Sequence, residues 1–128
     1  MPEKVARLSV AGGSPVVGIT VGYAHWGKYD IRLFGPDGLD PVLVGAGLTI
    51  DQIPDTYPIA PTLPVAALHG HLLGWQAAIA SYDDGDQPFS VHVTISQDDV
   101  VVPGGDVEQS GVMPGARLIV NFVRLEVA

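Results

Sequence analysis

Cysteine is absent from the 128-residue sequence, which excludes disulfides, thiolate metal sites and cysteine nucleophiles. Long apolar runs are missing too, because no window approaches the roughly 18 uninterrupted apolar residues of a membrane-spanning helix. The first ten residues, MPEKVARLSV, also lack the apolar core of a signal peptide. We therefore expect a cytoplasmic protein, and non-classical export remains open.

Positive charge is scarce as well. Six Lys and Arg stand against 14 Asp and Glu, so the formal net charge is −8. An acidic chain is repelled by phosphate backbones and by anionic lipid headgroups. The composition thus predicts that neither nucleic acid nor a membrane surface is a partner.

The length and hydropathy are those of an ordinary folded domain. A chain of 128 residues can bury a continuous core, so we predict one domain spanning residues 1–128. The mean hydropathy of +0.31 is high for a small monomer, whose large surface has to be kept wet by polar groups. Some apolar surface is therefore expected to lie between subunits of a homo-oligomer.

Sixteen Gly and 11 Pro interrupt the chain so often that few segments are long enough for a helix. The stretches between them alternate apolar and polar residues with the period of a half-buried strand, most clearly in FSVHVTI. Strands of this kind are predicted at 18–23, 28–34, 89–95 and 117–127. Turn residues follow at 25–28, 35–38, 83–88, 97–99, 103–105 and 113–115. This spacing predicts an all-β fold, an antiparallel β-sandwich of about seven or eight strands.

Three segments depart from simple alternation. The last strand is apolar on both faces at 118–120, which is typical of a central strand. Four prolines between residues 54 and 64 argue against a regular ladder and indicate a crossing between sheets. Residues 65–73 predict a short helical or irregular piece that leads into a strand at 72–82.

Acidic turns flank the 89–95 strand. Asp83, Asp84 and Asp86 precede it, and closely spaced loop carboxylates can bind calcium. Asp98, Asp99 and Asp106 follow the strand, too far along the chain to share an ion with the first group. We interpret these residues as hairpin ends, and a calcium site at Asp83, Asp84 and Asp86 is the alternative.

Aromatic residues gather at the first predicted turn. Tyr23, His25 and Trp26 lie within four residues, and an exposed indole can pack against the apolar face of a sugar ring. If the two halves of the chain are related, Tyr82 occupies the matching turn. These four residues are the predicted ligand site, and Trp26 folding back onto the core or into a subunit interface is the alternative. Trp75 is predicted to be a core residue and Asn121 a structural one.

Catalytic signatures are missing. The sequence contains no G-x-S-x-G elbow, no P-loop and no dinucleotide fingerprint. A transition-metal site would need His69, His71 and His92 to converge. We therefore predict a non-enzymatic binding module, lectin-like, with a protein ligand as a further option. The alternatives are an assembly subunit and a metal-dependent enzyme that uses these histidines.

Overall fold

The computed structural model describes residues 4–22, 26–49, 54–80 and 85–128, and these residues form nine strands and one short helix. The elements in chain order are β1 (Val5–Leu8), β2 (Val16–Val21), β3 (Trp26–Phe34), β4 (Val42–Thr49), β5 (Asp55–Pro58), the 3₁₀ helix η1 (Val65–Leu68), β6 (Leu72–Ala80), β7 (Gln87–Gln97), β8 (Val100–Met113) and β9 (Ala116–Val127). No described helix is long and apolar enough to cross a membrane.

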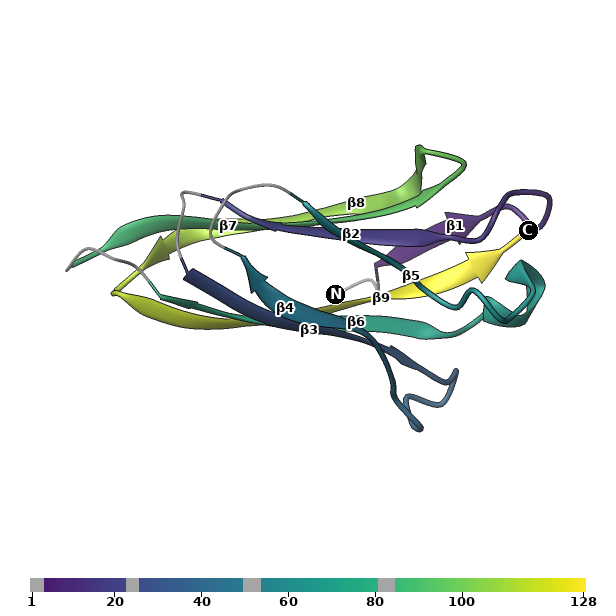
Figure 1. Cartoon of the computed structure of the whole chain (residues 1–128), viewed down its shortest axis with the longest axis horizontal. Helices are drawn as coiled ribbons and strands as arrows, with labels where there is room; N and C mark the ends of the chain where they lie inside the picture. The colour runs from purple at the N-terminus through teal and green to yellow at the C-terminus, as the bar shows by residue number, and fades with distance from the viewer. Residues whose placement is uncertain (1–3, 23–25, 50–53, 81–84) are drawn as a thin grey trace.

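The strands form two layers (Figure 1). One sheet has five strands in the order β1-β9-β6-β3-β4, and the other has four in the order β5-β2-β7-β8. Every pairing is antiparallel except the short parallel pairing of β1 with β9. The predicted all-β sandwich is confirmed, with more strands than expected because β1 and β5 have only four residues each.

Alternation explains how the layers pack. In β7, Phe89, Val91, Val93 and Ile95 are buried, and the residues between them face away from the core. β6 repeats the pattern with Leu73, Trp75, Ala77 and Ile79, which confirms Trp75 as a core residue. These two rows belong to different sheets and meet in a single apolar cluster.

Several predicted turns are confirmed, and two are wrong. Residues 35–38 lie between β3 and β4, residues 114–115 connect β8 to β9, and Asp98 and Asp99 form a two-residue hairpin turn with φ of 52° and 63°. Positive φ at both positions is the geometry that a tight hairpin requires. The turn at 25–28 is wrong because β3 already begins at Trp26. The turn at 103–105 is wrong because these residues form a bulge inside β8.

The bulge in β8 holds the two layers together at one side. Gly104 has a φ of 75°, and a Cβ added to it would lie 1.9 Å from the carbonyl oxygen of Val5 in β1. Only glycine allows so close an approach between two backbones. Nearby, the buried Gln97 side chain accepts a hydrogen bond from Ser9 N–H and donates to the carbonyls of Ser9 and Gly13. This amide fixes the loop between β1 and β2.

The proline-rich segment crosses between the layers, as predicted. β4 lies in the five-stranded sheet, β5 pairs with β2 in the other sheet, and β6 returns to the first. The prediction of no ladder is wrong for residues 55–58, since this edge strand needs only four residues free of internal proline. The predicted helical piece at 65–73 is confirmed as η1, which leads into β6.

β9 differs from the predicted central strand. Ile119, Val123 and Leu125 are buried, but Leu118 and Val120 are 60% and 62% exposed. Among the described residues, β1 pairs with β9 only at 124–127, so β9 is central at its end, and no described strand pairs with its earlier part on that side. Asn121 is half-buried, and its Oδ1 accepts a hydrogen bond from the N–H of Phe122, the next residue of its own strand.

Candidate functional site

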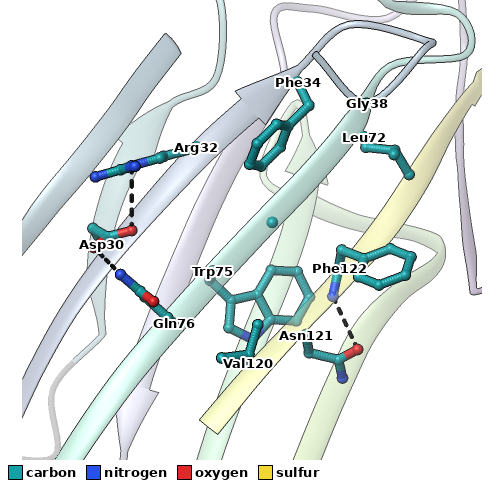
Figure 2. Close-up of a pocket in the computed structure, with 11 residues that line it drawn as sticks. Asp30, Arg32, Phe34, Gly38, Leu72, Trp75, Gln76, Val120, Asn121 and Phe122 are labelled. Carbon is teal, nitrogen blue, oxygen red and sulfur yellow. Dashed lines mark hydrogen bonds and ion pairs between the residues drawn. The ribbon is translucent and has the colours of Figure 1, made fainter. Parts of the chain in front are cut away.

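A groove crosses the outer face of the five-stranded sheet over β3, β6 and β9. It encloses about 310 Å³ and presents mostly apolar surface. Figure 2 shows its lining: Asp30, Arg32, Phe34, Gly38, Leu72, Gly74, Trp75, Gln76, Val120, Asn121 and Phe122. A volume of this size matches the lower end of the range for small-molecule sites.

Strand register creates the groove. Arg32, Gly74 and Phe122 lie side by side in one row across β3, β6 and β9. Because Gly74 has no side chain, the middle of this row is a hollow between longer neighbours. The ring of Phe34 leans over the hollow, and a Cβ added to Gly74 would lie 3.1 Å from that ring. Phe34, Leu72 and Phe122 surround this part of the groove (Figure 2).

Polar groups lie together at the other end of the groove (Figure 2). Gln76 Nε2 donates a hydrogen bond of 2.8 Å to Asp30 Oδ2, and Arg32 Nε lies 3.5 Å from Asp30 Oδ1. The carboxylate and the guanidinium have opposite charges, so this end carries little net charge. It still offers donors and acceptors to a ligand, since Arg32 has five N–H donors and the amide of Gln76 both donates and accepts.

A second polar cluster lies between the sheets. The Tyr29 hydroxyl donates a 2.7 Å hydrogen bond to Asp55 Oδ2 and lies 2.5 Å from the Tyr57 hydroxyl, which reaches the carbonyl of Ala46. Burial raises the pKa of the Tyr29 hydroxyl, and its hydrogen bonds to Asp55 and Tyr57 act in the same direction. The ring of Tyr57 also fills the space above Gly45. We assign this cluster to the packing of β5 against the five-stranded sheet.

The predicted aromatic site falls mostly on residues that the structure does not describe. Tyr23, His25 and Tyr82 lie outside the described ranges, and of Trp26 only the backbone is described, paired with Ala80. Trp26 begins β3 four residues before Asp30, so its backbone lies roughly 13 Å along the strand from the polar end of the groove.

The aspartates of the predicted acidic turns are also described only in part. Asp83 and Asp84 lie outside the described residues, and Asp86 is exposed just before β7. The whole of β7 separates Asp86 from Asp98, about 40 Å at the rise of a strand. Asp98 accepts a hydrogen bond from the Gly13 N–H, which suits a hairpin turn. Asp106 lies 2.5 Å from the ring of His92, away from both turns.

The three described histidines do not converge on a metal. His69 Nδ1 accepts a hydrogen bond from the Val127 N–H beside the five-stranded sheet, whereas His92 lies on β7 in the other sheet. His71 is half-buried, and its Nδ1 has no hydrogen-bond partner. Among the described residues, no group of three or more His, Asp and Glu could hold a metal ion.

The groove was not predicted from the sequence, although its signals are visible there. Gly74 interrupts a strand of alternating residues, and Phe34 and Phe122 occupy outward positions in theirs. What the sequence does not give is the strand order, which brings residues 30–34, 72–76 and 120–122 into one site.

The fold and the groove define an all-β sandwich with a mostly apolar groove on the outer face of its larger sheet. Comparison of the chain with protein-family models, with curated proteins and with solved structures gives no match.

Proposed function

We propose that the protein is a non-enzymatic binding module whose groove takes an uncharged saccharide. The observation that carries this proposal is the pairing of an apolar hollow, walled by Phe34 and Phe122, with a polar end of three hydrogen-bonding side chains. A sugar ring has both kinds of surface, because its C–H face packs on aromatic carbon and its hydroxyls both donate and accept hydrogen bonds.

The charges of the groove support an uncharged ligand. Arg32 and Asp30 already form an ion pair, and either charge alone would have favoured a ligand of opposite sign. The groove is open at the surface, and its polar residues are exposed or half-buried. Such a site keeps its polar groups hydrated until a ligand replaces the water, which suits reversible binding rather than catalysis.

The experiment is a screen on an array of uncharged and acidic glycans, followed by calorimetric titration of the best ligand. We expect Phe122→Ala and Phe34→Ala each to weaken binding tenfold or more, about 1.4 kcal/mol. The control is Val112→Ala, an exposed apolar residue on β8 of the other sheet, which should bind as the wild type does. Wild-type affinity in both phenylalanine variants would contradict the proposal.

A further inference from the structure

The edge of β9 before its contact with β1 differs from the other sheet edges. β9 pairs with β6 along one of its edges. Along the other edge it pairs with β1 only at residues 124–127, and no described residue pairs with 116–122 on that side. The direction of the backbone groups follows from two hydrogen bonds: Arg124 N–H points to β1, and Leu125 N–H points to the residue before β6. By alternation, the N–H and C=O groups of Ala116, Leu118 and Val120 point away from β6, toward the side on which no described residue pairs with them.

The other edges carry features that block strand addition. β1 and β5 have four residues each, and prolines stand before and at the end of β5. β8 has a bulge, Pro103, and the outward carboxylates of Asp106 and Glu108. β4 follows Pro41 and has a register shift against β3. Short length, proline, bulges and charge are the devices that keep sheet edges from associating.

The 116–122 edge has few of these devices. It contains no proline or acidic residue, and its one charge, on Arg117, lies 5.1 Å from the ring of Phe89. Its outward side chains Leu118, Val120 and Phe122 are 60%, 62% and 52% exposed. Only the Phe122 N–H is capped, by Asn121, and this cap marks where an added strand would end.

We infer that the chain forms a homodimer in which the two β9 edges pair antiparallel about a two-fold axis at Leu118. In this register Leu118 faces its own copy and Ala116 faces Val120 of the partner subunit. The Asn121 cap is kept, and each Arg117 lies opposite an apolar Ile119 rather than opposite the second Arg117. An identical edge is complementary to itself under two-fold symmetry, and a segment without acidic residues lets a second copy of a −8 chain approach with little repulsion.

The extent of the contact predicts a reversible dimer. A ladder over residues 116–120 is about 17 Å long, which with the flanking side chains falls at the small end of stable interfaces. Dimerisation should therefore depend on protein concentration. β3 lies two strands away from β9, so Phe34, Asp30 and Arg32 on the far side of the groove are clear of the ladder.

The test is analytical ultracentrifugation from about 1 to about 500 µM protein. We expect the wild-type mass to rise from 13.4 kDa toward twice that value. Leu118→Lys should weaken association at least tenfold. The matched control is Leu48→Lys, 68% exposed on β4 at the opposite edge of the same sheet, which should associate as the wild type does. Circular dichroism checks that both variants are folded.

Three results would overturn the inference. They are a wild-type monomer throughout the range, unchanged association of Leu118→Lys, and loss of association in Leu48→Lys, which would place the contact on the whole sheet face. A monomer that still binds a saccharide would remove the dimer and leave the binding proposal standing. A dimer that binds no saccharide would remove the binding proposal and leave the dimer standing.

Discussion

On the outer face of the four-stranded sheet, Thr20, His92 and Glu108 lie in one row across β2, β7 and β8. On the outer face of the five-stranded sheet, the comparable row is Arg32, Gly74 and Phe122. Further rows carry the contrast only in part: the first face adds threonine, serine and aspartate but also Val101 and Val112, and the second adds leucine, valine and alanine but also Asp30 and Gln76. Both faces come from strands with the same alternation, but only the larger sheet has the groove and the exposed apolar residues of β9.

The contrast separates the residues that the fold requires from those that are available for contact with a ligand or partner. A strand with one buried side needs only solvated residues on its other side, and the four-stranded sheet meets that need mainly with hydroxyls and charges. Exposed Leu118, Val120 and Phe122 add nothing to the core, and apolar surface gathered in this way is typical of an interaction site. Function is therefore expected on the larger sheet.

The largest expected effect comes from disrupting the contact between β1 and β8, which joins the two sheets. Gly104→Ala forces a Cβ against the Val5 carbonyl and strains a φ of 75°. We expect a loss of about 3 kcal/mol in the free energy of unfolding and about 10 °C in Tm, measured by thermal denaturation.

The matched control is Gly85→Ala. Its φ is also positive, at 85°, but a Cβ there would meet no described atom within 4 Å. Backbone strain alone should cost about 1 kcal/mol. Equal losses in the two variants would mean that the contact between β1 and β8 does not hold the layers together.

The next largest effect is alkaline destabilisation through Tyr29. Its pKa in the folded protein is raised above the ordinary value of 10.0, so the folded state holds the proton more tightly than the unfolded chain does. The stability that this hydroxyl contributes is complete below pH 10 and is lost above it, by up to about 1.4 kcal/mol per pH unit.

Tyr29→Phe isolates this effect. Near neutral pH the variant should lose about 1 kcal/mol, because its hydrogen bonds to Asp55 and Tyr57 are gone. Urea denaturation above pH 10 should then show a shallower fall for Tyr29→Phe than for the wild type. Parallel curves would show that the hydroxyl does not link β5 to the larger sheet.

A pair of glycine substitutions sharpens the contrast between the faces. Gly74→Ala should displace the ring of Phe34 and weaken saccharide binding about tenfold. In Gly18→Ala the new methyl meets Thr94 and Thr56 on the outer face of the other sheet, and binding should not change. Calorimetric titration measures both. A loss of binding in Gly18→Ala that exceeds the loss in Gly74→Ala would contradict the assignment of function to the larger sheet.

The smallest effects are expected from exchanging side chains on the outer faces of the two sheets. Leu48→Thr and Thr94→Val should each change the free energy of unfolding by less than about 0.5 kcal/mol, because neither side chain is part of the core. Solubility in ammonium sulfate should move in opposite directions, higher for Leu48→Thr and lower for Thr94→Val. A large stability loss in either variant would show that its face is packed rather than solvated.

Much of the fold could be predicted from local patterns, and the candidate site could not. Alternation in residues 89–95 and the Asp98-Asp99 turn are local, and both predictions are confirmed. The bulge at Gly104 was mistaken for a turn because its cause is Val5, distant in sequence. Leu118 and Val120 were expected to be buried, but they project from the outer face of the five-stranded sheet, which no described layer covers. The groove depends on strand order, which composition and period do not encode.

Amide chemical-shift mapping by NMR, with a saccharide found on the glycan array, tests the central proposal most directly. We predict perturbations in residues 30–34, 72–76 and 120–122, and none in the row of Thr20, His92 and Glu108. Perturbations confined to residues 23–26 and 81–86 would move the site to the predicted aromatic and acidic turns. Perturbations on the four-stranded sheet alone, or none at saturating ligand, would contradict the assignment of the groove as the binding site.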